Sequence, residues 1–341
     1  TTYPKADGTK AEQGYRESSS TGTFTNNNDG TYTYVFGTDI SKAKTPVGAK
    51  AITYDRKLTH RVTIMFGGHA GATAEAFYDF VPDGTSTGIT RDIVQTAACK
   101  NCHGERDFAG HGGDRLTMEG CVMCHNPSST DAQSGETLDM TQMIHKIHAG
   151  HELPSIPGAD GIVFDDPATT TDESADNGTY AIYGYKNTKH SWERAAFPAV
   201  IENCTKCHTG AGKDVAAYSK NPTRDACGSC HDDVNFATGV GHGSTNLKQL
   251  DDKACFGCHP ASGVKAAVMD AHDWTSTANA DPRNTNEFNV SVTVSKPANG
   301  THFVKGEKPV ASVVIKDLTG TAMDHTKIDK SSGAEGCLST G

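Results

Sequence analysis

The sequence predicts a multidomain protein in which two antiparallel β domains flank a central domain that is largely irregular and helical. Short segments of alternating apolar and polar residues, bounded by turn residues, occur in residues 1–95 and 281–341. Residues 96–280 contain few periodic apolar stretches and hold every copy of a Cys-x-x-Cys-His motif. A chain of 341 residues also exceeds the usual size of one domain. We therefore expect a β domain, a motif-bearing domain and the incomplete start of a second β domain.

The predicted strands of the flanking domains are bounded by turn residues. In the first domain, Thr31–Phe36 follow the turn-like Asn26–Gly30, and His60–Phe66 end before two glycines. In the last domain, Phe288–Val294 and Val310–Ile315 alternate in the same way. Alternation of this kind is typical of antiparallel strands that cover a core with one face.

The central domain carries its motif five times. Two thiols at this spacing form thioether bonds with the vinyl groups of one haem, and the adjoining imidazole becomes the proximal ligand of its iron. The thioether residues would be Cys99, Cys102, Cys121, Cys124, Cys204, Cys207, Cys227, Cys230, Cys255 and Cys258. The proximal ligands would be His103, His125, His208, His231 and His259. The motifs therefore predict five covalent haem c groups and a pentahaem domain.

Two other uses of paired cysteines explain the motif less well. Zinc sites with four thiolates are built from Cys-x-x-Cys units, but they leave the histidine after every second cysteine without a role. A disulfide framework also needs cysteines in even numbers, but pairs at this spacing close very small loops and require no histidine. Haem attachment accounts for every residue of the motif.

The sixth coordination position of each iron decides between electron relay and substrate binding, because a second histidine closes that position. Six histidines of the central domain are candidates for the five distal positions: His111, His145, His148, His190, His242 and His272. His151 is expected to orient a propionate or to face solvent. His60, His69, His302 and His325 lie in the β segments and are expected to be ordinary surface or turn residues.

One predicted helix carries two of the distal candidates. Residues Leu138–Ala149 are expected to form a helix that ends at Gly150. His145 and His148, three residues apart, would project from neighbouring faces of one turn and so ligate two different haems. A zinc-binding His-x-x-His pair is the alternative.

The other four distal candidates differ in their neighbours. His111 and His242 are each flanked by glycines, whose small size would let a porphyrin approach the backbone closely. His190 and His272 each stand two residues before a tryptophan, and either could instead hydrogen-bond a propionate or a carbonyl. Because five positions have six candidates, one of these last two is expected not to bind iron.

Composition excludes several classes of protein. Apolar residues (AVILMFWYC) make up only 35% of the chain, and no apolar run approaches the ~20 residues that would span a bilayer. The formal net charge of −10 argues against nucleic acid as a partner. Because covalent haem attachment follows export, we expect a secretory signal to have been removed before Thr1. Nucleotide-binding and nucleophile motifs are lacking, so no catalytic residues are predicted.

Two features lie outside the haem motifs. An acidic stretch offers hard oxygen ligands for calcium, a further candidate cofactor, but it lacks a complete EF-hand loop, so a solvated linker is favoured. Its members are Asp165, Asp166, Asp172, Glu173 and Asp176, with Asn177. Cys337 is a lone thiol in a chain expected to be exported, and half of a disulfide is favoured over a free thiol.

Four segments that occur in order resemble the OmcA/MtrC family of outer-membrane decahaem cytochromes. They are Asp92–Cys99, His111–Arg115, Met143–Gly150 and Cys227–Gly239. The resemblance covers nearly the whole chain and is most specific in the central domain. It implies split-barrel β domains that alternate with pentahaem domains. The chain has five motifs rather than ten, so it is similar to the amino-terminal half of the family, and Cys337 would align with the first cysteine of a disulfide whose partner lies beyond Gly341.

The motifs and the resemblance favour electron transfer rather than catalysis. Bis-His haems packed in a chain would carry electrons to extracellular metal oxides, flavins, humic substances or partner cytochromes, supplied by an outer-membrane electron conduit. The resemblance implies a cell-surface or secreted location, with the periplasm less favoured. Outer-sphere reduction of a terminal metal acceptor is compatible with this function. Two alternatives stay open, a multihaem oxyanion reductase with one open haem and a subunit of a polymeric conducting filament.

Overall fold

The computed structural model describes residues 15–18, 20–44, 51–66, 73–85, 90–107, 111–127, 129–158, 178–264, 266–274, 288–317 and 320–322. The chain divides into two compact units, Thr1–Asp273 and Trp274–Gly341. The predicted boundary near residue 95 lies inside the first unit, so the predicted limits 1–95, 96–280 and 281–341 stay predictions.

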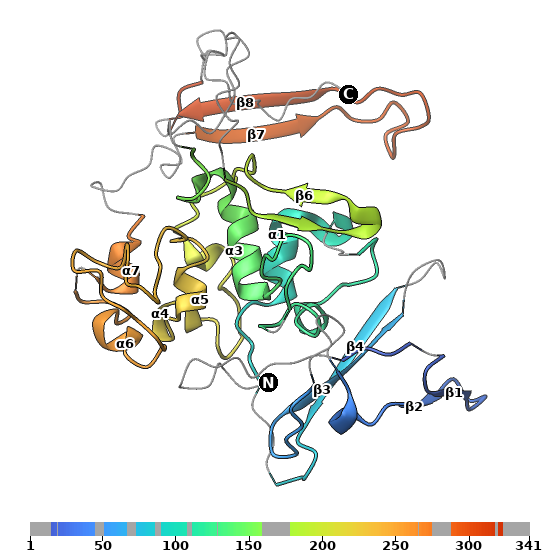
Figure 1. The fold of residues 1–341 in the computed structure, drawn as a ribbon. Coiled ribbons are helices and arrows are strands. Elements are labelled where there is room, and N and C mark those ends of the chain that lie inside the picture. Colours follow the sequence, from blue (N-terminus) through green and yellow to red (C-terminus); the bar gives the residue numbers. More distant parts are fainter. Residues whose placement is uncertain are drawn as a thin grey trace. The chain divides into compact units, whose positions relative to one another are not determined.

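The amino-terminal part of the first unit consists of two antiparallel hairpins (Figure 1). They are formed by β1 (Thr23–Asn26) with β2 (Tyr32–Val35) and by β3 (His60–Phe66) with β4 (Ala74–Phe80), with a short 3-10 helix, η1 (Ile40–Lys42), between them. In the β1–β2 turn, Asn28 and Gly30 have φ angles of 60° and 88°, a backbone conformation that asparagine and glycine accept more readily than other residues.

The predicted strands of this region are confirmed. The segment Thr31–Phe36 contains β2, and His60–Phe66 is β3. β1 and β4 were not predicted, since β1 has only four residues and the alternation of β4 is broken where Phe77 and Tyr78 follow one another. The described strands form separate two-stranded sheets, which differs from the split barrel that the resemblance implies.

Short helices and one small hairpin are the regular elements in the other described residues of the first unit (Figure 1). Only α1 and α3 among its α-helices exceed four residues in the described part of the chain. The elements are α1 (Thr96–Asp107), α2 (Met118–Cys121), α3 (Met140–Ala149), η2 (Gly150–Glu152), β5 (Ala181–Tyr183), η3 (Tyr185–Asn187), β6 (Lys189–Ser191), η4 (Cys204–Lys206), α4 (Ala217–Lys220), α5 (Arg224–Cys227), α6 (Cys255–Cys258) and α7 (Val268–Ala271).

The helix α3 confirms the helix predicted over Leu138–Ala149. It begins at Met140, after the extended residue Asp139. It ends at Gly150, whose φ of 51° and ψ of −121° suit glycine and not residues with a side chain. The chain therefore turns sharply after Ala149.

The apolar core of the first unit lies around α3. Met140 and Met143 of this helix pack with Tyr180, and Ala149 packs with Leu153 and Ile156. Large apolar side chains such as Phe256 and Leu250 stay exposed, at 49% and 70%. As the scarcity of periodic apolar segments predicts, side chains alone build only a small core in the described residues.

A buried aspartate fixes the β5–β6 hairpin. Asp131 is 8% exposed and accepts hydrogen bonds from the N–H groups of Ser134 and Tyr183 at 2.7 and 3.2 Å. Burial acts to raise the pKa of Asp131, but these hydrogen bonds together lower it. The loop before α3 is thereby joined to β5.

The described part of the second unit is one antiparallel hairpin. It pairs β7 (Phe288–Val294) with β8 (Ala311–Asp317), which confirms the strand predicted at Phe288–Val294 and shifts the one predicted at Val310–Ile315 by one residue at its start. The hairpin leaves valines exposed on both strands, for example Val292 at 59% and Val313 at 56%. A two-stranded hairpin that buries so little is at best marginally stable by itself.

We predict that Gly150→Ala strongly destabilises the protein. A Cβ at this position would overlap the carbonyl oxygen of Ala195, and the φ of 51° already disfavours a side chain. Strain and steric overlap together should cost about 3 kcal/mol or more. Urea unfolding of the haem-loaded protein, followed by far-ultraviolet circular dichroism, measures this loss.

Gly135→Ala is the matched control for this substitution. Gly135 also has a positive φ, 77°, but a Cβ there would meet nothing within 4 Å. Its cost should stay near the ~1 kcal/mol of backbone strain alone. Equal losses in the two variants would show that the contact with Ala195 does not matter.

Candidate functional site

Each Cys-x-x-Cys-His motif forms one helical turn. The first motif lies in α1, where Cys99, Cys102 and His103 occupy positions i, i+3 and i+4, and Gly104, with a φ of 67°, ends the regular helix. In the other four motifs, the N–H of the histidine donates to the carbonyl of the first cysteine at 2.8–2.9 Å. Positions i, i+3 and i+4 share one face of a helix. Both thiols and the imidazole are therefore directed to the same side.

Threonine N-caps begin the turns of the second and fourth motifs. Thr117 Oγ1 accepts from the N–H of Gly120, and Thr223 Oγ1 accepts from the N–H of Ala226, both at 3.1 Å. The carboxylate of Glu75 in β4 accepts from the N–H and the hydroxyl of Thr117 at 2.7 and 2.8 Å. The β3–β4 hairpin is thereby fixed to the second motif.

The structure brings each motif histidine together with one distal candidate. Each pair joins residues far apart in the sequence or on different turns, and no histidine occurs in two of these pairs. The distances between ring centroids are 6.0 Å for His103 and His148, 5.9 Å for His125 and His111, 6.4 Å for His208 and His145, 6.0 Å for His231 and His272, and 6.1 Å for His259 and His242.

These distances match those of an iron held between two imidazoles. A metal–nitrogen distance of about 2 Å on each side places the two ring centroids about 6 Å apart. The interplanar angles range from 28° to 78°, which corresponds to different rotations of the two rings about a common axis. His145 and His148 each face a different motif histidine, so they are not arranged as one zinc pair.

Hydrogen bonds orient the paired rings. Six paired histidines use Nδ1 to bind a protein oxygen at 2.7–3.0 Å: His125, His145, His148, His242, His259 and His272. The acceptor is a backbone carbonyl in every case but one, and a carbonyl can only accept. Nδ1 therefore carries the proton, and the lone pair of Nε2 is available for a metal.

Burial keeps several of these imidazoles neutral. It lowers the pKa of His145 to about 4, an effect to which the neighbouring His208 and His148 add. Burial also lowers the pKa of His125 and of His208. Neutral imidazole is the form that binds metals, so these rings are ready to ligate iron at neutral pH.

His190 is the distal candidate that the structure leaves out of these pairs. It lies on the exposed strand β6, opposite Ile182 of β5, and no ring contact joins it to a motif histidine in the described part of the chain. His272 instead follows α7 and faces His231. The two histidines that the sequence left undecided thus have different surroundings.

The remaining histidines are placed as follows. His151 binds the carbonyl of Ala195 through Nδ1 at 2.8 Å. His60 lies at the start of β3 beside the ring of Tyr54, and His302 contacts the hydroxyl of Thr301 at 3.0 Å. His69, His325, Cys337 and the acidic residues between Asp165 and Asn177 lie outside the described residues.

The thiols of different motifs lie close enough to influence one another. Burial raises the pKa of the thiols of Cys99, Cys121, Cys227 and Cys230, to about 11 for Cys121 and Cys230, and a thiol of another motif contributes to each of these shifts. The couplings between motifs join Cys121 to Cys99, Cys99 to Cys207, Cys230 to Cys204 and Cys227 to Cys255. Coulomb interactions weaken with distance, so the two thiols of each of these pairs lie near one another.

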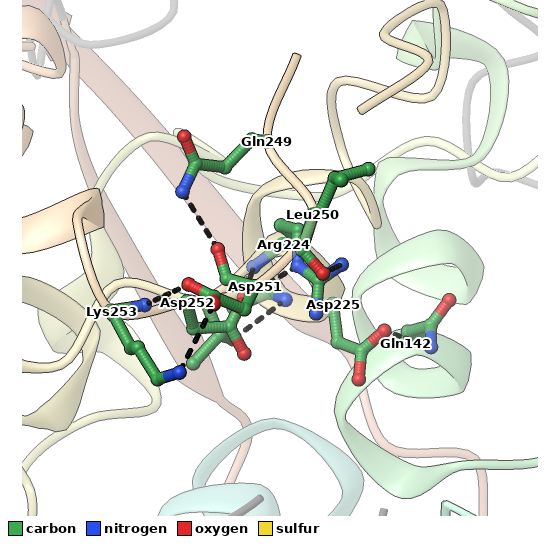
Figure 2. Close-up of polar contacts among 10 residues, drawn as sticks. Gln142, Arg224, Asp225, Gln249, Leu250, Asp251, Asp252 and Lys253 are labelled. Atoms are coloured by element: carbon green, nitrogen blue, oxygen red, sulfur yellow. Dashed lines mark hydrogen bonds and ion pairs between the residues drawn. The ribbon is translucent and has the colours of Figure 1, made fainter. Parts of the chain in front are cut away.

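Side chains also join the fourth and fifth motifs. Arg224 and Asp252 each stand three residues before the first cysteine of their motif. Arg224 donates to Asp252 Oδ1 at 2.8 Å and to the carbonyl of Leu250 at 2.7 Å (Figure 2). The side chains are 24% and 18% exposed, so this ion pair is largely shielded from solvent.

The helix α3 contacts the fourth motif through three side chains. Gln142 donates to Asp225 at 3.1 Å (Figure 2). One turn later, His145 contacts the hydroxyl of Ser229 at 3.0 Å, and Lys146 contacts Asp232 at 3.1 Å. The helix that carries two distal candidates is therefore also attached to the fourth motif.

The structure reveals contacts that sequence reasoning missed. Glu75, Ser229 and the Arg224–Asp252 pair all hold motif segments in place. A repeated threonine four residues before the first cysteine, at Thr117 and Thr223, was a usable signal for the caps. No sequence signal identifies the others, because their partners are distant along the chain.

The residues present fit covalent haem. Each pair of imidazoles would supply two nitrogens to the iron of one haem. The thiols of each motif, on the same helical face as its imidazole, would attach that haem. Space beside the rings is also open, since a Cβ added at Gly113, near His111, or at Gly243, near His242, would meet nothing within 4 Å. A flat porphyrin requires such space next to its axial ligands.

Comparisons with known proteins agree with this site. The family described as "Outer membrane cytochrome MtrC/MtrF-like, domains II/IV" matches residues 91–273, and an OmcA-like N-terminal domain matches residues 6–90. The multiheme cytochrome MtrC of Shewanella baltica (strain OS185) is 28% identical over 247 residues, which cover 70% of this chain and 29% of that protein.

Two solved structures are also similar. The outer membrane decaheme cytochrome OmcA aligns over 91% of this chain and 41% of that one, with a TM-score of 0.56 and 24% identity, which shows a shared fold. MtrC from S. baltica OS185 aligns over 89% and 40%, with a TM-score of 0.49 and 23% identity. This chain thus spans less than half the length of these relatives. With one family matching residues 91–273 and a second matching 6–90, the chain belongs to the OmcA/MtrC family of multihaem cytochromes.

Proposed function

We propose that this chain is an electron carrier with five haem c groups, each bound between one motif histidine and one distal histidine. The observation that carries the proposal is the pairing of five motif histidines with five different distal partners at 5.9–6.4 Å. Among the six distal candidates, this assigns His111, His145, His148, His242 and His272 as ligands and leaves His190 without iron. When bound, the haems supply reversible one-electron chemistry.

The same pairs favour electron transfer over the two alternatives. An oxyanion reductase needs an iron with a free sixth position, whereas every motif histidine here faces a second imidazole. A filament that borrowed a histidine from its neighbour would leave one motif histidine of this chain without an intrachain partner. The pairs therefore support a carrier whose irons bind no substrate.

The couplings between thiols support an order for the haems. The second motif lies next to the first, the first next to the third, the third next to the fourth, and the fourth next to the fifth. Electrons would then pass along the series second, first, third, fourth and fifth. In this arrangement the polypeptide fixes the spacing of the haems, and its hydrogen bonds and burial tune their potentials.

We assign the carrier an extracellular role at the outer membrane. The description of the matching family and the printed name of OmcA both contain the words outer membrane, which supports this location. Helices in the described part of the chain lack the length and hydropathy needed to cross a bilayer. Partner cytochromes or an outer-membrane conduit would donate the electrons, and metal oxides, flavins or humic substances would accept them.

We predict that His272→Met alters one haem and His190→Met alters none. His272 faces a motif histidine, whereas His190 lies on an exposed strand. Exchange of an imidazole for a thioether changes the visible and electron paramagnetic resonance spectra of the haem concerned. The ligand assignment is wrong if the His190 variant changes the spectra or if the His272 variant does not.

We also predict that the reduced wild-type protein does not bind carbon monoxide. An iron with two imidazoles resists this ligand, whereas an open iron takes it readily. Titration of the reduced protein, followed in the Soret band, measures the bound fraction. Rapid binding of one equivalent per chain would favour the reductase, and size-exclusion chromatography of the same sample would reveal a filament.

The link between the fourth and fifth motifs gives a third prediction. In a double-mutant cycle, Arg224→Ala and Asp252→Ala should show a coupling of about 0.5–3 kcal/mol in urea unfolding of the haem-loaded protein, because the ion pair is shielded and the guanidinium donates a hydrogen bond to the carboxylate. Lys253→Ala is the control, since its bridge to Asp251 is more exposed, at 56% and 32%, and should leave stability nearly unchanged. Additive effects in the cycle would exclude this ion pair as the link.

A further inference from the structure

Ser229 is the most deeply buried polar residue of the fourth motif. It is the second of the two residues between Cys227 and Cys230 and is 0% exposed. Its hydroxyl donates to the carbonyl of Ala226 at 2.5 Å and also lies 3.0 Å from Nδ1 of His145. A residue inside one haem-attachment motif thus contacts the distal histidine that faces a different motif.

The two contacts of the hydroxyl fix the proton on His145. A serine hydroxyl has one hydrogen, which the Ala226 carbonyl accepts at 2.5 Å, and the Cys230 sulfur is a further hydrogen-bond partner of this hydroxyl. Toward His145 the oxygen can therefore only accept, so Nδ1 must donate. The lone pair of the ring is then on Nε2, the nitrogen free to face the iron between His145 and His208.

The backbone around this contact is held in place on both sides. Lys146 and Asp232, the neighbours of His145 and His231, form an ion pair at 3.1 Å with side chains only 15% and 7% exposed. Asp232 also accepts hydrogen bonds from the N–H and the hydroxyl of Ser155 at 3.0 and 2.5 Å. The distance between Ser229 and His145 is therefore set by the surrounding structure and not by the one hydrogen bond.

His145 differs in this respect from the other oriented rings. His125, His148, His242, His259 and His272 donate from Nδ1 to backbone carbonyls, which no substitution removes. Nδ1 of His145 lies 3.0 Å from a side-chain oxygen, that of Ser229, which the sequence can change, and the backbone carbonyl of Thr141 is a second acceptor for this ring. One of the two acceptors of this candidate axial ligand is therefore open to adjustment by a single residue.

We propose that Ser229 is a positioning residue for the iron of the third haem, although it lies in the attachment motif of the fourth. This inference rests on the proposed bis-His ligation by His145 and His208. An oxygen that accepts from Nδ1–H makes the imidazole a stronger donor through Nε2 and stabilises the oxidised iron. The attachment loop of the fourth haem thereby helps to set the potential of the third.

The test measures individual haem potentials in the fully loaded chain. His145→Met first identifies the resonances of the third haem in paramagnetic nuclear magnetic resonance spectra, because that haem alone loses an imidazole. Ser229→Ala should then shift the same resonances and move the potential of that haem to a more positive value. The other four haems should keep their potentials.

Ser219→Ala is the matched control. Ser219 is also buried, 6% exposed, and its hydroxyl also donates to the carbonyl three residues before it, Ala216, at 3.3 Å. It makes no hydrogen bond to a histidine among the described residues, so its loss should leave all five potentials unchanged. Ser229→Thr and Ser229→Val form a second matched pair. The two side chains have the same shape, but only threonine keeps the hydroxyl group.

The possible outcomes distinguish the role of Ser229 from the ligation of iron by His145. A shift at the third haem in the alanine and valine variants, reversed by threonine, supports the role of Ser229. A shift only at the fourth haem, or no shift, overturns that role while the effect of His145→Met keeps the ligation intact. If His145→Met alters no haem, the ligation by His145 is wrong and the role of Ser229 is overturned with it.

Discussion

The fold depends on one constraint, that each motif histidine must meet a second imidazole from elsewhere in the chain. The motif itself is local, since a single helical turn places two thiols and one imidazole on the same side. The distal histidine is not local, and its position requires tertiary structure. The apolar core around α3 is small. The five histidine pairs therefore define much of the arrangement of the central region. Most of the described elements of the central region hold a histidine in position opposite another histidine.

The helix α3 illustrates how these supports are shared. It carries His148 and His145, which face the histidines of the first and third motifs, and it makes side-chain contacts with the fourth motif. Arg224 and Asp252 then join the fourth motif to the fifth, while Glu75 joins the second to the β3–β4 hairpin. Neighbouring motifs share these contacts. Under the proposed ligation, a substitution in one attachment loop would therefore change the reduction potential of the next haem. Such sharing suits a carrier in which spacing between centres matters more than access to any one of them.

Sequence patterns predicted the helices and strands that depend on interactions between residues close together in the chain. The helix up to Ala149, its end at Gly150, β2, β3 and β7 were all predictable from periodicity and turn residues. The candidate distal histidines could also be collected from the sequence, but their partners could not. His190 and His272 look alike in sequence, each two residues before a tryptophan, and only the tertiary structure separates them. Ser229 occupies a position that the motif leaves variable, so no pattern marks it.

The central claim is that all five irons are closed by two histidines. Near-infrared magnetic circular dichroism of the oxidised, fully loaded protein tests this claim most directly, because the energy of the charge-transfer band identifies the axial ligand pair of each low-spin haem. The account predicts a spectrum in which the five haems that the motifs provide all give the bis-imidazole band, with no high-spin contribution. A high-spin band, or a band from another ligand pair at any of the five centres, would contradict it.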